Sequence, residues 1–202
     1  MTSKHPADLM SQLQAYEHEL GSLPPVHLWN PPLCTNVQMR IDRQGRWYYM
    51  DSPIGRDRMV RLFSKVLRFD EDGCYYLVTP IEKIRVLVED SPFSVLQWHS
   101  QGQSEQRNIW FTANTGERFP LDSAHPLTVS STDDQQPIPR VIVRSNLRGL
   151  ISRNLYYQLI NTALDEQPPD STAEESVGLY SFSRFFSLQP QMLAEGHERA
   201  SG

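Results

Sequence analysis

The stretch LDSAHP contains Asp122, Ser123 and His125, which are the residue types of a hydrolytic triad. In such a site a carboxylate orients a histidine, and the histidine takes the proton from a serine nucleophile. A nucleophilic serine is usually exposed on a G-x-S-x-G turn, but Ser123 has no glycine two positions before or after it. Asp-Ser-Ala-His also forms ordinary turns, so the pattern favours a turn over a catalytic site.

The sequence contains no recognisable metal or cofactor motif. Its six histidines are scattered without an H-E-x-x-H or similar ligand pair. Cys34 and Cys74 lack the C-x-x-C spacing of zinc sites, and free thiols are their expected state. Phosphate-loop and dinucleotide glycine patterns are absent as well. We therefore expect no metal, no cofactor and no enzymatic activity.

Four basic residues follow one side of the helix expected within residues 51–69. Because successive helical residues are rotated by about 100°, Arg58, Arg61, Lys65 and Arg68 share one face and the apolar residues share the other. This basic stripe is suited to phosphates or to an acidic partner. A solvated helix face is the more usual explanation, because nearby acidic residues offset its charge. These residues are Asp57, Asp70, Glu71 and Asp72.

Arg153 falls inside the broad apolar side of a later predicted helix, between Ile160 and Leu164 and close to Tyr157. A buried guanidinium costs on the order of several kcal/mol unless it is paired, so a carboxylate or an anionic ligand is expected beside it. A structural ion pair is the favoured outcome, and ligand binding is the alternative. The candidate carboxylates are Glu82, Glu89 and Asp90.

Other charged residues lie where they can face inward. Arg144 ends the strand-like run RVIVR, and Arg56 lies in the first turn of its predicted helix. In the stretch from residue 75 to residue 93, Lys83, Arg85 and Glu89 alternate with apolar residues and are expected to face solvent or the other half of the protein. Glu82 instead follows the corner made by Pro80, where a site can form.

The remaining pattern predicts an α+β fold. An amphipathic helix is expected at 6–20 and a proline-rich extended segment after it. Alternation predicts a hairpin over 37–50 with a turn at Gln44 and Gly45. Further strands are expected within 75–79, 84–88, 94–100, 107–113 and 139–145, followed by a helix over 147–164.

Two short segments suggest an internal duplication. GRWYYMDS at 45–52 and GERFPLDS at 116–123 share a glycine, an aromatic residue, an aliphatic residue and Asp-Ser, and each is expected to lead towards a helix. The chain then divides into an N-terminal helix and linker (1–25), two strand-rich halves (26–95 and 96–165) and a polar, largely disordered tail (166–202). Within that tail, the aromatic segment 178–188 either docks on the domain or a dimer mate, or binds a partner.

Composition limits the class of protein. A chain of 202 residues with 39% hydrophobic content can bury one ordinary core or two small ones that share an interface. A net charge of −5 gives no overall attraction for nucleic acid. No apolar run reaches the roughly 18 residues of a membrane span, and the first residues lack a signal-peptide pattern. A cytoplasmic protein without nucleic-acid or membrane partners is expected.

The runs MRIDRQGRWYYMDSPIGRDRMVRLFSKVL, YYLVTPIEKIRVLVEDSPF and IVRSNLRGLISRNLYYQL, with HLWNPP before them and HPL between the last two, carry a specific resemblance. Together they resemble the proteobacterial family catalogued as domain of unknown function 1285, over about residues 26–165. This chain has CTNVQ where the family tends to have a Gly-Asp-Ile-Asp-like segment. Residues 1–25 and 166–202 are expected to lie beyond the family core.

The resemblance implies a duplicated α+β fold whose C-terminal half is similar to a pleckstrin-homology-like barrel. It also implies a small-molecule site between the halves and a role in signal transduction. On this chain, the residues expected near such a site are Arg56, Thr79, Glu82, Arg144 and Arg153.

The leading hypothesis is a non-catalytic regulatory protein that binds an anionic small molecule between its halves. The alternative is a protein-interaction module that uses the pleckstrin-like half and the aromatic segment, and a Ser/His hydrolase is less favoured. Homo-oligomerisation is left open.

Overall fold

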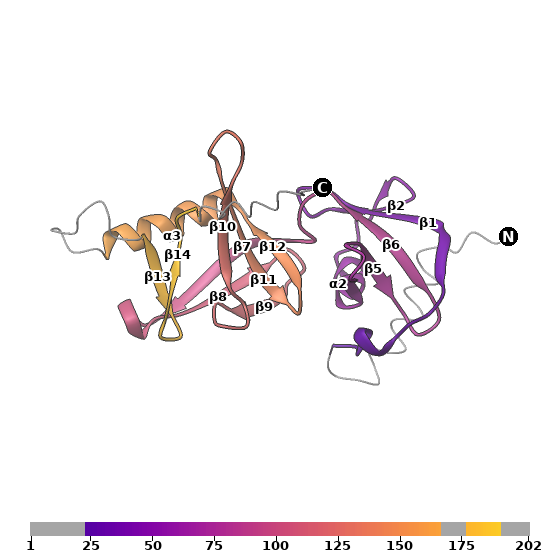
Figure 1. The fold of residues 1–202 in the computed structure, drawn as a ribbon, viewed down its shortest axis with the longest axis horizontal. Coiled ribbons are helices and arrows are strands. Elements are labelled where there is room, and N and C mark those ends of the chain that lie inside the picture. Colours follow the sequence, from indigo (N-terminus) through magenta and orange to yellow (C-terminus); the bar gives the residue numbers. More distant parts are fainter. Residues whose placement is uncertain (1–22, 167–176, 191–202) are drawn as a thin grey trace, which may run out of the picture.

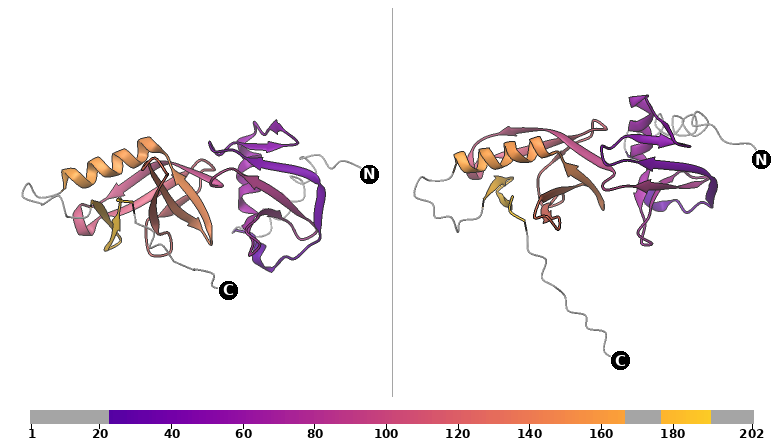
Figure 2. Two further views of the ribbon diagram at one scale, coloured as in Figure 1. Left: turned by 45° about the horizontal axis from the view of Figure 1, so that its top comes forward. Right: turned by 90° about the horizontal axis from the view of Figure 1, so that it is seen from above.

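The computed structural model describes residues 23–166 and 177–190, so the helix expected at 6–20 lies outside the described residues. The first half contains η1 (Val26–Leu28), β1 (Leu33–Ile41), β2 (Trp47–Tyr49), β3 (Ser52–Pro53), α2 (Asp57–Lys65), β4 (Leu67–Phe69), β5 (Tyr75–Val78) and β6 (Lys83–Val88). The second contains β7 (Phe93–Gln101), η2 (Ser104–Gln106), β8 (Asn108–Ala113), β9 (Arg118–Pro120), β10 (Leu127–Ser131), β11 (Pro137–Arg144), β12 (Leu147–Ile151), α3 (Arg153–Asp165), β13 (Gly178–Ser181) and β14 (Arg184–Ser187). The α+β class is confirmed, and the two halves lie side by side along the long axis of the molecule (Figures 1 and 2).

The first half is a six-stranded sheet with α2 packed on it. The predicted hairpin is present, because β1 pairs antiparallel with β2. Met39 and Ile41 point into the core, where Trp47 meets Phe63 of α2 at a ring-centroid distance of 6.3 Å. The helix expected within residues 51–69 is shorter than predicted. Pro53 belongs to β3 and pairs with Tyr48 of β2, and α2 begins only at Asp57.

The second half is a six-stranded sheet that curls into a half-barrel, with α3 packed against it (Figure 1). The helix expected over 147–164 is wrong in its first part, because 147–151 forms β12. Gly149 faces the core there, and a Cβ on it would lie 2.9 Å from a methyl group of Val143. The helix proper starts after Ser152, whose hydroxyl accepts the Leu155 N–H at 3.4 Å.

Both sheets have the same strand order. The first runs β3-β2-β1-β6-β5-β4, and the second, read from β9, runs β9-β8-β7-β12-β11-β10. In each sheet the strands that come first and last along the chain, β1 with β6 and β7 with β12, form the central parallel pair. The two similar sequence segments are not equivalent within this repeat, since Gly45 lies between the first and second strands and Gly116 between the second and third. The segment at 116–123 leads to β10 and not to a helix.

The aromatic segment 178–188 forms the hairpin β13–β14 and packs on its own half. Leu179, Phe186 and Leu188 are buried. The Tyr156 hydroxyl of α3 donates to the Leu188 carbonyl at 2.5 Å. This is the docking alternative of the two expected for the segment. In the part of the chain that the structure describes, no helix is long and apolar enough to cross a membrane.

Candidate binding site between the two halves

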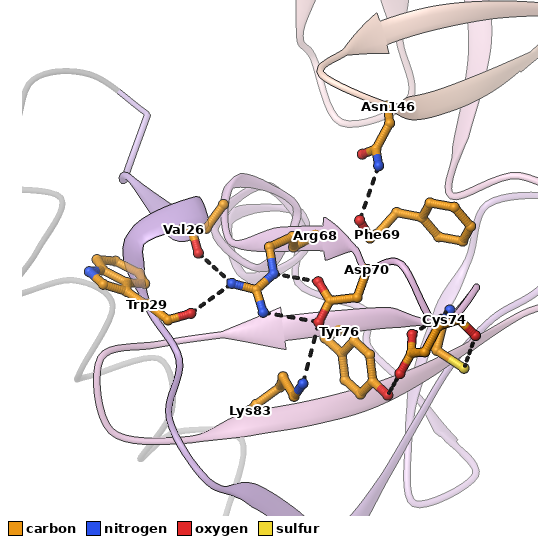
Figure 3. A network of polar contacts seen from close by, with 10 residues as sticks. Val26, Trp29, Arg68, Phe69, Asp70, Cys74, Tyr76, Lys83 and Asn146 are labelled. Atoms are coloured by element: carbon orange, nitrogen blue, oxygen red, sulfur yellow. Dashed lines mark hydrogen bonds and ion pairs between the residues drawn. The ribbon is translucent and has the colours of Figure 1, made fainter.

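The end of β11 and the turn that follows it contact the first half. Arg144, the last residue of β11, donates a hydrogen bond to the backbone carbonyl of Ser64 in α2 and forms an ion pair with Glu117. The Asn146 side-chain amide donates to the Phe69 carbonyl at 3.1 Å (Figure 3). The Arg144 guanidinium also lies 5.1 Å from the centroid of the Phe93 ring. Arg144 therefore contacts both halves at once.

A second contact joins the β1–β2 turn to the β8–β9 turn. The Asn114 side-chain amide donates to the Gly45 carbonyl at 3.0 Å, and its oxygen accepts the Ser94 N–H at 3.1 Å. Gly45 has a φ of +75°, and a Cβ there would lie 2.5 Å from Asn114 Nδ2. The backbone conformation and the close approach both require glycine at this position.

A cavity of about 560 Å³, here called the larger cavity, lies between these elements. Its walls come from the proline-rich segment before β1, which includes η1, from the end of α2 with β4, and from the β11–β12 turn with Arg144. The described lining is partly apolar and contains three cationic residues but no carboxylate. The cations are Lys65, Arg68 and Arg144, with His27 and Asn146 as further polar groups.

A second cavity of about 450 Å³, here called the smaller cavity, shares Leu23 and Lys65 with the larger one. Arg61 and Ser64 of α2 line one side of it. The β8–β9 turn lines the other side with Thr115, Gly116 and Glu117. Both halves therefore contribute walls to each cavity.

Arg68 holds the wall of the larger cavity in place (Figure 3). Its guanidinium donates to the carbonyls of Val26 and Trp29 at 2.6 and 2.7 Å and pairs with Asp70 at 2.5 Å. Lys83 also reaches Asp70, at 3.3 Å. The hydrogen bond from Arg68 holds the pKa of the Asp70 carboxyl below its usual value. Arg68 thus ties both ends of η1, in the proline-rich segment, to β4.

The five residues expected near the site lie in different places. Arg144 lies at the interface and lines the larger cavity. Arg56 is an exposed residue at the N-terminus of α2. Thr79 and Glu82 are buried in the β5–β6 turn, where the Thr79 hydroxyl accepts the Glu82 N–H at 3.1 Å. Arg153 was expected to be buried and is exposed, because the buried side of α3 is formed by Leu155, Tyr156, Leu159 and Ala163.

Several lining residues did not stand out as site residues in the sequence. Arg61, Lys65 and Arg68 of the basic stripe line the cavities, although a solvated face was the favoured explanation. Asn146 and Thr115 lie in turns and carry no sequence signal of their own. The sequence signal for these residues was the helical spacing of the basic stripe. That spacing shows that the basic residues share a face, but it does not show which part of the fold packs opposite that face.

The stretch with Asp122, Ser123 and His125 forms a turn. One oxygen of Asp122 accepts the backbone N–H groups of Ala124 and His125, at 2.9 and 3.0 Å, and contacts His125 Nδ1 at 2.8 Å. Burial raises the pKa of the Asp122 carboxyl, but the hydrogen bonds from His125 and Ala124 outweigh it, so the pKa is lowered. Asp122 therefore caps this turn.

Two protein-family models match consecutive parts of this chain. The model of "Domain of unknown function (DUF1285), N-terminal domain" matches residues 24–91, and the model of "Protein of unknown function (DUF1285), C-terminal domain" matches residues 92–188. The chain belongs to the DUF1285 family. The two models meet just before β7, whereas the sequence boundary after residue 95 lies inside that strand. The C-terminal model also includes the β13–β14 hairpin, so this hairpin is not beyond the family core.

Two solved DUF1285 structures are similar to this chain. A family protein from Silicibacter pomeroyi DSS-3 is 35% identical, with a TM-score of 0.72, and the match covers 88% of this chain and 94% of that one. A family protein from Shewanella baltica OS155 is 25% identical, with a TM-score of 0.49, over 61% of this chain and 91% of that one. No curated protein matches this chain.

Proposed function

We propose that this DUF1285 protein is a non-catalytic, cytoplasmic regulatory protein that binds a small anionic molecule between its two halves. One observation carries the proposal: the described lining of the two cavities contains four cationic residues and one carboxylate. The cations are Arg61, Lys65, Arg68 and Arg144, and the carboxylate is Glu117. Cations that line a partly enclosed cavity favour an anionic ligand, because the low-dielectric walls strengthen the attraction.

Arg144 supports the regulatory part of the proposal. Its guanidinium bonds to Ser64 of the first half and to Glu117 of the second. An anionic ligand would compete with Glu117 for this guanidinium and so change the contact between the halves. A ligand that binds one arrangement of the halves more tightly shifts the equilibrium towards it.

Native mass spectrometry of the gently purified full chain tests the proposal first, followed by thermal shift with a panel of phosphates and carboxylates. Binding should raise the melting temperature with the concentration dependence of RT ln(1 + [L]/Kd). Arg144→Ala should abolish the shift. Arg148→Ala, an exposed arginine on β12 that lines neither cavity, should retain it. Absence of any bound molecule and of any shift across the panel would contradict the proposal.

A second candidate function is a protein-interaction module built on the curled second half, for which the family resemblance implies a pleckstrin-like fold. Phe182 and Phe185 of the β13–β14 hairpin favour it, because they are 41% and 39% exposed. The ring of Phe182 lies edge-on to the ring of Trp110, with 5.4 Å between the ring centroids, and Trp110 extends the apolar surface onto β8. A Phe182→Ser, Phe185→Ser double variant that keeps its fold and all its co-purifying partners would argue against this module.

A further inference from the structure

The larger cavity lies beside apolar side chains that are exposed in the described part of the fold. Leu23 lines the cavity and is 49% exposed, and Leu28, in the same proline-rich segment, is 72% exposed. The described lining adds three cations without a carboxylate. Figure 3 shows two of the walls, with Arg68 on one and Asn146 on the other. Such a surface is suited to an amphipathic segment with acidic flanks.

Residues 6–20 have this composition. The apolar stripe of their predicted helix consists of Leu9, Leu13, Tyr16 and Leu20. The segment contains no lysine or arginine, and its three carboxylates are Asp8, Glu17 and Glu19. In helical projection, Glu17 and Glu19 fall on the two flanks of the apolar stripe. The segment is therefore complementary to the cavity in both polarity and charge.

The chain itself brings this segment to the cavity. Leu20 is three residues before Leu23, so their Cα atoms lie at most about 11 Å apart. Because Leu23 lines both cavities, the end of the segment is confined to their edge. A segment tethered this closely has an effective concentration on the order of millimolar, so even a weak intrinsic affinity populates a docked state.

We propose that residues 6–20 dock as an amphipathic helix across the mouth of the larger cavity, with the apolar stripe on Leu23 and the acidic flanks towards the lining cations. The docking goes beyond the proposed function, and one consequence rests on that function. An anionic ligand has to displace the segment, because both are attracted by the same cations. The segment then acts as an internal competitor that weakens ligand binding.

Amide hydrogen exchange of the unliganded full chain tests the docking. An isolated helix of about 15 residues is marginally stable in water, so slowed exchange over residues 9–20 requires contacts with the rest of the protein. Leu13→Asp should quicken that exchange at least about tenfold, since it removes a leucine from the docked stripe. Ser11→Asp adds the same charge on the opposite side of the predicted helix and should exchange as the wild type does. Wild-type exchange at the rate of an unstructured chain, or equal acceleration in both variants, would overturn the docking.

Opposite charges at Ser145 locate the docked segment. Ser145 is an exposed residue of the β11–β12 turn and lines the larger cavity. Ser145→Asp should quicken exchange over residues 9–20 about twofold and Ser145→Lys should slow it by a similar factor, because a single exposed charge pair contributes little. Changes of the same sign in both variants would exclude the cavity as the docking surface. Protection that rises with protein concentration would assign the segment to a second copy of the chain, against the proposal.

Isothermal titration calorimetry with 2-naphthoate, an aromatic carboxylate, tests the competition. Leu13→Asp should bind this probe at least about threefold more tightly than the wild type, and Ser11→Asp should bind it as the wild type does, because only the first variant loses the competitor. Saturating naphthoate should also release the protection over residues 9–20 in the wild type. Binding that leaves this protection intact would overturn the competition. If neither naphthoate nor any other anion of the panel binds, the proposed function fails, whereas the exchange results still decide the docking.

Discussion

The side-chain amide of Asn146 donates to the Phe69 carbonyl at 3.1 Å, which attaches the β11–β12 turn of the second half to the last residue of β4 (Figure 3). Arg144, two residues earlier at the end of β11, reaches the Ser64 carbonyl. Residues 144–146 therefore hold the second half against α2 and β4, and they also form one wall of the larger cavity.

Asn146→Ala should loosen this contact without unfolding either half. The lost hydrogen bond is exposed, so the free energy of unfolding should fall by no more than about 1 kcal/mol. Amide hydrogen exchange around residues 144–147 should quicken. Asn154→Ala, an exposed asparagine on α3, serves as the control and should leave exchange in the turn unchanged. Wild-type exchange in Asn146→Ala would show that the contact does not hold the turn.

Gly45→Ala should destabilise the protein more than Gly73→Ala. Both glycines have φ values near +75°, so an added Cβ strains each backbone by roughly 1–2 kcal/mol. Only at Gly45 would the Cβ also collide with Asn114, whose hydrogen bonds join the two halves. The extra loss in the free energy of unfolding, measured by urea denaturation, should be at least about 1 kcal/mol. Equal losses of unfolding free energy in the two variants would mean that the Asn114 side chain can move aside at little cost and that its hydrogen bond to Gly45 contributes little stability.

Much of the fold could be predicted from side-chain alternation, because a strand with one buried face repeats every two residues. Val37, Met39 and Ile41 are buried in β1 as this pattern indicates. β12 was missed because Gly149 points into the core but has no side chain to mark the alternation. The remaining apolar residues, Leu147, Leu150 and Ile151, are spaced in a way that also fits a helix.

The predicted burial of Arg153 was wrong for a related reason. Tyr157 and Leu164 are apolar but 48% exposed, and counting them as buried rotates the predicted inner face of α3 towards Arg153. The candidate site was still harder to predict. A helix pattern places Arg61 and Lys65 on one face, but the turn that carries Thr115 comes opposite them only when the two halves pack together.

The stability of the protein should fall below about pH 4, and Asp70 should account for part of the loss. Hydrogen bonds from Arg68 and Lys83 lower the folded-state pKa of Asp70 below its ordinary value of 3.8. The ionised form is therefore stabilised by folding, and this contribution is present above the unfolded pKa and disappears as the pH falls through the folded pKa. Asp70→Asn should be less stable at pH 7 and should lose less stability between pH 5 and pH 2. An unchanged pH profile in urea denaturation would exclude this role.

Tyr156→Phe should release the β13–β14 hairpin from α3. The Tyr156 hydroxyl donates to the Leu188 carbonyl at 2.5 Å, and removing it leaves that carbonyl without this bond while the ring packing is kept. The free energy needed to open the hairpin locally should fall by about 1–2 kcal/mol, so the rate of proteolysis within residues 178–188 should increase more than the rate of global unfolding.

Tyr157→Phe is the matched control, since Tyr157 is the neighbouring tyrosine of α3 and is 48% exposed. It should leave the rate of cleavage in the hairpin at the wild-type value. If both variants are cleaved at the wild-type rate, the hairpin is held by the burial of Leu179 and Phe186 alone. If both are cleaved faster, the effect comes from the helix as a whole and not from the bond to Leu188.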